Sequence, residues 1–129
     1  MKLRGHHLYC VPFSKSSFSE RGENYVRVED KIKRVMRGES EEPVEVILGI
    51  DELCQACPLC QNDRCQSPEG DEDEIRKFDS IILKGLDVSV GTTLSVREWR
   101  KLFEQKSPLN FCQKCRFNVL CEIGSGNIF

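Results

Sequence analysis

Eight cysteines constrain this chain more than any other feature of its sequence. They form a central group, a C-terminal group and one lone residue: Cys54, Cys57, Cys60 and Cys65; Cys112, Cys115 and Cys121; and Cys10. A gap of two residues between cysteines lets one tight turn direct both thiolates at a single centre. All eight cysteines are therefore candidate metal ligands.

Length and charge narrow the class of protein. A chain of 129 residues is expected to form one domain, residues 1–129. It has neither a secretion signal nor a long apolar run, so we expect a cytoplasmic protein without membrane contact. A formal net charge of -2 and a pI near 5.8 disfavour nucleic acid as a partner. In a reducing compartment, grouped cysteines bind metal more often than they form disulfides, with hyperthermophile proteins as an exception.

Apolar periodicity predicts an α+β fold that is mainly helical, with about three long helices, one or two short strands and two cysteine-rich loops. Candidate caps place the helix starts at Ser17, at Ser67–Pro68 and at Ser95. The β-branched run 44–48 predicts a strand. The well-capped helices are expected to hold the two cysteine groups in place.

Other residues are assigned to the scaffold. The aromatic side chains of Tyr25, Phe78 and Trp99 recur at helical spacing, which favours a place in the core over a stacking platform. The acidic run 71–74 falls in the first turns of a predicted helix, where negative charge is favourable. We therefore expect that run to be solvated rather than to bind a metal or a partner.

The central group has the form C-x2-C-x2-C-x4-C. Three cysteines in such a close run resemble the loop around a cubane cluster in bacterial ferredoxins, whereas structural zinc sites usually divide into two separated ligand pairs. The match is incomplete, because Cys65 comes one residue late and Pro58 follows the second cysteine instead of the fourth. The spacing favours an iron–sulfur cluster, expected to be of the four-iron, four-sulfur type, and leaves zinc as the alternative.

The C-terminal group has the form C-x2-C-x5-C and resembles part of the ligand run in auxiliary iron–sulfur domains of radical enzymes. That run continues with a fourth cysteine, where this chain has Ser125. By count Cys10 could complete the set, although one site that draws on both groups is equally allowed. The alternative for Cys10 is a small buried side chain, because free cysteine is among the most buried residue types.

The only two histidines, His6 and His7, lie shortly before Cys10. Imidazole binds zinc or iron and carries protons near neutral pH, so both histidines are candidate ligands or catalytic groups. Arg4 is a third candidate, as a group that orients an anionic ligand. The alternatives are a hydrogen-bonded histidine pair near a helix start and an arginine paired with a carboxylate.

The order of these motifs resembles a family of short bacterial and archaeal proteins, a domain of unknown function with suspected iron–sulfur binding. The resemblance spans essentially the whole chain and rests on the stretch Arg4–Cys10, the stretch Asp51–Pro58 and the C-terminal cysteine group, in that order. Every cysteine matches a family position except Cys60, which looks like an addition and weakens the likeness to ferredoxins. The resemblance implies metal binding and supplies no activity.

The sequence therefore leads to the hypothesis of a small iron–sulfur protein that transfers electrons to a protein redox partner or senses through its cluster. A structural zinc domain acting as an interaction module is the first alternative. A metal-dependent enzyme that uses His6, His7 and Arg4 is the second, and a disulfide-stabilised protein is the third. Iron with acid-labile sulfide would support the leading hypothesis, and stoichiometric zinc the first alternative.

Overall fold

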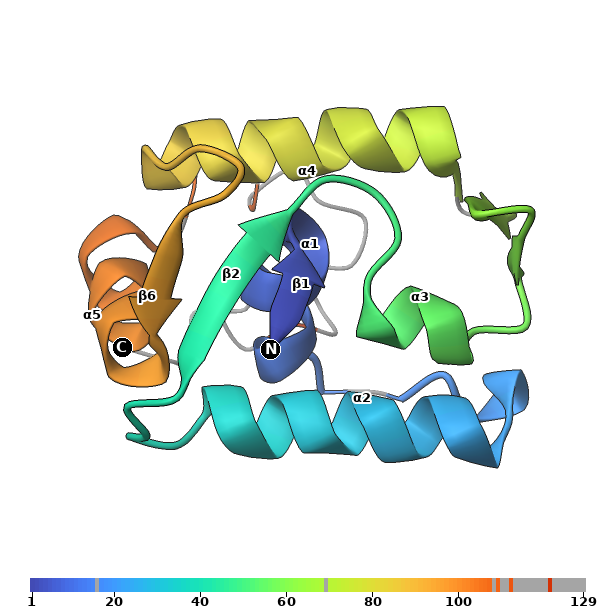
Figure 1. Cartoon of the computed structure of the whole chain (residues 1–129), viewed down its shortest axis with the longest axis horizontal. Coiled ribbons are helices and arrows are strands. Elements are labelled where there is room, and N and C mark those ends of the chain that lie inside the picture. The colour runs from blue at the N-terminus through green and yellow to red at the C-terminus, as the bar shows by residue number, and fades with distance from the viewer. Residues whose placement is uncertain (16, 69, 108, 110–111, 113–120, 122–129) are drawn as a thin grey trace.

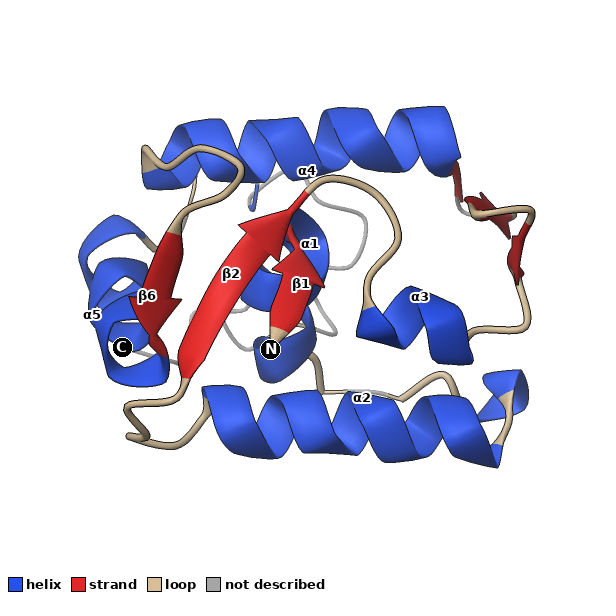
Figure 2. Ribbon diagram, viewed as in Figure 1, coloured by secondary structure: helices blue, strands red, loops and turns tan. Residues whose placement is uncertain are grey.

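The structure is a computed structural model that describes residues 1–129 except 16, 69, 108, 110–111, 113–120 and 122–129. Within the described residues the chain is α+β, with five α-helices and two sheets of three strands each (Figure 1 and Figure 2). The predicted architecture of about three long helices with one or two short strands is therefore wrong. Several of the strands are only two or three residues long, too short to show a detectable alternation of apolar and polar residues.

The elements follow one another as β1 (Lys2–Arg4), α1 (Gly5–Tyr9), α2 (Glu23–Met36), β2 (Pro43–Ile47), α3 (Glu52–Ala56), β3 (Cys60–Gln61), β4 (Arg64–Ser67), β5 (Gly70–Asp71), α4 (Glu72–Leu86), β6 (Thr93–Ser95) and α5 (Val96–Lys106). Two 3-10 helices, η1 (Val11–Phe13) and η2 (Ser19–Arg21), connect α1 to α2. None of the described helices combines the length and the apolar character needed to cross a membrane.

The first sheet has the strand order β1-β2-β6 and lies at the front of the view in Figure 1. β1 runs parallel to β2, with Leu3 opposite Val46, and β6 runs antiparallel to β2. In that view α1 lies behind the sheet, α2 and α4 lie along two sides of it, and α5 lies beside β6. Val44 and Val46 are fully buried while Pro43 is exposed, so one face of β2 packs on the core. The strand predicted at 44–48 is confirmed.

The core is filled from the helices that surround this sheet. Trp99 of α5 is fully buried, and its indole Nε1 donates a hydrogen bond to the carbonyl of Val44 at 2.8 Å. Tyr25 of α2 is also buried, which confirms the scaffold assignment of both aromatic residues. Phe78 of α4 is only half-buried, and its ring centroid lies 5.6 Å from that of His6.

The predicted cap at Ser95 is confirmed and the predicted cap at Ser17 is wrong. The Ser95 hydroxyl accepts the N–H of Glu98, whose carboxylate accepts the N–H of Ser95, so the capping box is complete. Ser17 lies well before α2, and its hydroxyl instead donates to the buried carboxylate of Glu29 at 2.5 Å. The Ser17 hydroxyl therefore binds a side chain from the middle of α2, which itself begins only at Glu23.

The helix start predicted at Ser67–Pro68 is also wrong. Ser67 belongs to β4, and α4 begins at Glu72, where the Asp71 carboxylate accepts the N–H of Glu74 at 3.0 Å. The expectation that the run 71–74 is wholly solvated fails as well, because Glu72 is fully buried. Within this acidic run, Asp71 caps the helix and Glu72 places a carboxylate in the protein interior.

The second sheet, β3-β4-β5, is antiparallel throughout. Asn62 and Asp63 form the two-residue turn between β3 and β4, with φ values of 54° and 57°. Positive φ at both turn residues is the signature of the type I′ turn that closes tight hairpins, and asparagine and aspartate tolerate it well. The turn places Cys60 directly opposite Cys65.

Replacing Gly5 with alanine is expected to destabilise the protein. A Cβ at this position would lie 3.0 Å from the backbone oxygen and 3.2 Å from the Cα of Asp79, so α1 and α4 would have to separate. Overpacking of this kind costs about 1–3 kcal/mol. Urea unfolding of Gly5→Ala measures this cost. The control is Gly85→Ala, whose new Cβ has side-chain atoms of Leu109, and no backbone atoms, as its three nearest neighbours.

Candidate metal centre

The helix α3 positions the first pair of the central cysteines. Asp51 precedes this short helix, and its Oδ1 accepts the N–H of Cys54 at 3.0 Å. Cys54 is 6% exposed, and Cys57, which ends the helix, is half-buried. The chain then turns at once, because the N–H of Cys60 donates to the carbonyl of Cys57 at 3.1 Å.

The β3–β4 hairpin supplies the second pair, Cys60 and Cys65. Partial burial and the charges of the other three central thiols raise the pKa of Cys60. None of the four central cysteines is joined in a disulfide. The structure therefore places the four candidate ligands of the central group on two adjacent elements, α3 and the β3–β4 hairpin. Among the described residues, no three of their sulfurs lie within 4.8 Å of one another.

A buried guanidinium reaches this group from the end of β1. Arg4 is fully buried, and its Nη1 donates to the Sγ of Cys54 at 3.5 Å. The same guanidinium binds both carboxylate oxygens of Glu72, at 3.1 Å and 2.8 Å. Glu72 Oε1 also accepts the N–H of Cys65 at 3.0 Å. The Arg4–Glu72 pair thus connects Cys54 of α3 with Cys65 of the hairpin.

Asp79 is the second carboxylate that binds the Arg4 guanidinium, and it also binds His6. Its Oδ2 accepts the Nε of Arg4 at 2.8 Å, and its Oδ1 accepts the backbone N–H of His6 at 2.9 Å. The Nδ1 of the His6 ring lies 2.7 Å from the same Oδ1. Arg4 therefore binds carboxylates rather than an external anion.

His7 lies on the other side of Cys54. Its Nδ1 is 2.7 Å from Oδ2 of Asp51, which also accepts the backbone N–H of Arg4 at 2.9 Å. Among the described residues, His7, Asp51 and Cys54 form the one trio of ligand-type side chains whose donor atoms all lie within 4.8 Å of one another. A carboxylate that orients a histidine beside a ligand is a common arrangement around protein-bound metals.

The two histidines differ in charge. Burial tends to lower the pKa of His7, but the charge and hydrogen bond of Asp51, together with the Cys54 sulfur, raise it to about 10. His7 in turn holds the pKa of Asp51 well below its usual range, against the effect of burial. Burial and the charge of His7 lower the pKa of His6. At neutral pH, Cys54 therefore faces two cations, Arg4 and His7.

Acid is expected to destabilise the metal-free protein. Burial tends to raise the pKa of Glu72, but hydrogen bonds from Arg4, Arg76 and the N–H of Cys65 lower it to about 2 from 4.5. A carboxylate with a depressed pKa stabilises the folded state above its unfolded pKa, and this contribution is lost as pH falls through the folded value. Between about pH 5 and pH 2, Glu72 alone should account for roughly 3 kcal/mol.

Urea unfolding across that pH range measures the loss. The matched control is Glu72→Gln, which has no carboxylate at position 72. This variant should lose less stability over the same pH range. Identical pH dependence in the two proteins would contradict the assignment of the acid sensitivity to Glu72.

A family model described as a protein of unknown function (DUF1284) matches residues 22–121. The chain belongs to this family. No curated protein and no solved structure matches it. The DUF1284 match covers the central cysteine group and extends to Cys121, but it begins after the segment with Arg4, His6 and His7. Membership of a family of unknown function is thus confirmed, while the motif, the taxonomy and the iron–sulfur binding implied by the resemblance stay predictions.

The last cysteine in the DUF1284 match, Cys121, lies near the N-terminal segment together with Cys112. The hydroxyl of Tyr9 is 3.9 Å from the Sγ of Cys112, and Ser14 forms an isolated β-bridge with Cys121. Cys10, at the end of α1, is on this side of the molecule. Cys115 and Ser125 lie outside the described residues, so the assignment of Cys10 to a second set of ligands stays a prediction.

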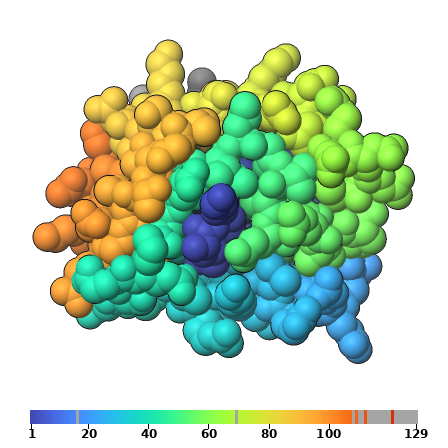
Figure 3. Space-filling model, viewed as in Figure 1, coloured from blue at the N-terminus to red at the C-terminus, as the bar shows by residue number. Residues whose placement is uncertain are grey.

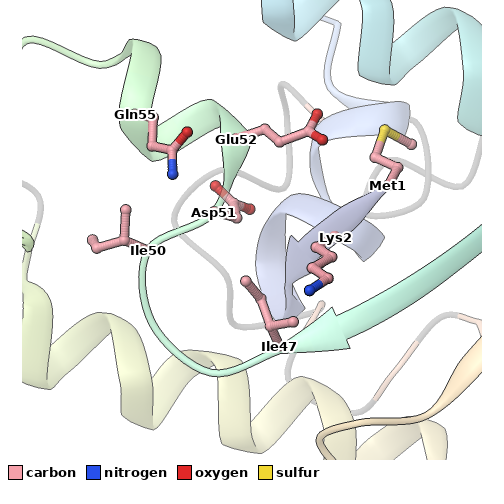
Figure 4. A pocket seen from close by; sticks show the side chains of 7 residues that line it. All are labelled: Met1, Lys2, Ile47, Ile50, Asp51, Glu52 and Gln55. Atoms are coloured by element: carbon pink, nitrogen blue, oxygen red, sulfur yellow. The ribbon is translucent and has the colours of Figure 1, made fainter.

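A shallow depression of about 370 Å³ adjoins Asp51 (Figure 4). It is lined by Met1, Lys2, Ile47, Ile50, Asp51, Glu52 and Gln55. Figure 3 shows the N-terminal residues reaching the surface between β2 and the segment that contains α3. Asp51 lines this depression and also accepts the N–H of Cys54.

Three acidic residues of this DUF1284 member were not predicted to lie at the site: Asp51, Glu72 and Asp79. Asp51 carried a signal, because aspartate directly before a short helix is a preferred cap. Glu72 and Asp79 are seven residues apart and share a face of α4 with the buried Leu86. Acidic side chains are seldom buried without a positively charged partner, so two of them on an apolar helix face predict a buried cation. In the structure that cation is Arg4.

Proposed function

We propose that this protein is an iron–sulfur protein whose cluster is held by Cys54, Cys57, Cys60 and Cys65, and that it transfers electrons or senses through this cluster. The observation that supports the proposal best is the placement of four cysteines on two adjacent elements, α3 and the β3–β4 hairpin, with a buried arginine against Cys54. The proposal places the protein in the cytoplasm, where thiols stay reduced, with a protein redox partner.

The surroundings of Cys54 suit a centre that accepts and releases electrons. A bound cluster would supply one-electron redox chemistry, and its potential depends on hydrogen bonds to the sulfur atoms and on burial. Here Arg4 donates to the Cys54 sulfur, and Asp51 holds the charged His7 close to it. Two cations beside a thiolate ligand would favour the more negative, reduced state. This arrangement supports a redox function more than a purely structural one.

Metal content tests the proposal. Protein expressed and purified without oxygen should contain iron and acid-labile sulfide in nearly equal amounts, with the visible absorption of a cluster. That absorption should bleach on reduction by dithionite. Colourless protein with stoichiometric zinc and no sulfide would overturn the proposal.

A structural zinc site is the second candidate, and the pairing of the ligands favours it. Cys54 lies within one short helix and Cys57 ends it, while Cys60 and Cys65 face each other across one hairpin, as in zinc sites built from two ligand pairs. This candidate predicts that a chelator unfolds the protein and that dithionite changes nothing. The interaction partner of such a module would be another protein.

A further inference from the structure

The register of the β3–β4 hairpin gives Cys60 and Cys65 a special relation. The N–H of Gln66 donates to the carbonyl of Leu59 at 2.9 Å, so these two residues form a hydrogen-bonded pair of the antiparallel ladder. Hydrogen-bonded and non-hydrogen-bonded pairs alternate along such a ladder. The next pair, Cys60 and Cys65, is therefore a non-hydrogen-bonded pair.

Such a pair is well placed for a disulfide. The Cα atoms of non-hydrogen-bonded partners lie about 4.5 Å apart, and their side chains leave the same face of the hairpin. Disulfides span Cα separations of about 4.4–6.8 Å. Cys60 and Cys65 could thus be joined without a shift of the backbone.

Access also favours this pair over the pair from α3. Cys60 and Cys65 are both half-buried, and the turn residues Asn62 and Asp63 between them are exposed. Cys54 is 6% exposed and lies against Arg4 and His7. A small oxidant therefore reaches the hairpin thiols more easily than it reaches Cys54.

We propose that Cys60 and Cys65 form a site of reversible oxidation by small-molecule disulfides such as oxidised glutathione. One cysteine thiolate attacks the glutathione disulfide, forms a mixed disulfide and releases one glutathione thiol. The second cysteine attacks the mixed disulfide, forms the Cys60–Cys65 bond and releases the second glutathione thiol. The two protein sulfurs are oxidised and glutathione disulfide is reduced to two thiols.

The consequence for the centre rests on the proposed function. The new bond takes two of the four ligands away, so the oxidised chain cannot hold a metal until a thiol reductant restores the pair. A bound metal engages both thiolates and protects them from the oxidant. Oxidation and metal binding at this site are therefore mutually exclusive.

Disulfide mapping of the metal-free protein tests the proposal. Reduced protein is incubated with oxidised glutathione, remaining thiols are alkylated, and trypsin cleavage after Arg64 separates Cys60 from Cys65. The peptide that ends at Arg64 also contains Cys54 and Cys57, so its fragmentation in the mass spectrometer identifies the linked cysteine. We expect Cys60 linked to Cys65 as the dominant product, with Cys54 and Cys57 alkylated. A dominant Cys54–Cys57 disulfide, or stable glutathione adducts on all four central thiols, would overturn the proposal.

Two variants and one metal measurement complete the design. Cys54→Ser combined with Cys57→Ser should still form the hairpin disulfide, whereas Cys60→Ser should retain a glutathione adduct on Cys65. Oxidised wild-type protein should bind at least tenfold less iron or zinc than reduced protein, and dithiothreitol should restore binding. If reduced protein binds no metal, the proposed function fails, while the peptide map still decides whether the disulfide forms.

Discussion

Replacing Arg4 with methionine is expected to lower the free energy of unfolding by about 3–5 kcal/mol. Methionine has a similar length but no charge, so the buried carboxylates of Glu72 and Asp79 would lose their shared partner. Removing one member of a buried ion pair is costly because the remaining charge stays out of water. Urea unfolding of the metal-free protein at neutral pH measures the change.

The matched control is Arg97→Met. Arg97 forms an ion pair with Glu41, but both side chains are mostly exposed, at 61% and 71%, and such pairs contribute at most about 1 kcal/mol. Adding Glu72→Gln and Asp79→Asn to Arg4→Met should recover part of the lost stability, because it neutralises the stranded charges. Equal stability of Arg4→Met and Arg97→Met would contradict the role given to the buried network.

Replacing Cys54 with serine is expected to lower the affinity of the centre for its metal by more than roughly a hundredfold. Losing a group that merely supports a metal ligand costs about 10–100-fold in affinity, so losing the ligand itself should cost more. Serine has nearly the shape of cysteine and can still accept the hydrogen bond from Arg4, which should preserve the fold. Competition against a chromophoric chelator measures the affinity, and circular dichroism checks the fold.

The control for this substitution is Cys10→Ser. Cys10 ends α1 beside Tyr9, whose hydroxyl is 3.9 Å from the sulfur of Cys112 in the C-terminal group. Cys10→Ser should keep the metal that Cys54→Ser loses, and adding Cys54→Ser to it should remove that metal. Wild-type affinity in Cys54→Ser would show that Cys54 is not a ligand.

The features that follow from neighbouring residues could be predicted from the sequence. The capping box of Ser95 and Glu98 and the strand at 44–48 both appear as expected. In each case the residues that interact are close in the chain, so spacing alone carries the information.

The buried polar network could not be predicted in the same way. Arg4 contacts Glu72 and Asp79 across 68 and 75 positions of sequence, and no local pattern records that pairing. The start of α4 was misplaced because Ser67–Pro68 resembles a helix start more than the true cap, Asp71. β1 was missed because three residues cannot show alternation, although this strand delivers Arg4 to the centre.

Anomalous diffraction from crystals grown without oxygen tests the central claim, that the four central cysteines share one metal centre. Data collected at the iron absorption edge should show density enclosed by the sulfurs of Cys54, Cys57, Cys60 and Cys65, with iron–sulfur distances of about 2.3 Å, close to those of zinc thiolate sites. Iron density at the C-terminal group alone, or a native crystal with disulfides in place of metal at these four residues, would contradict it.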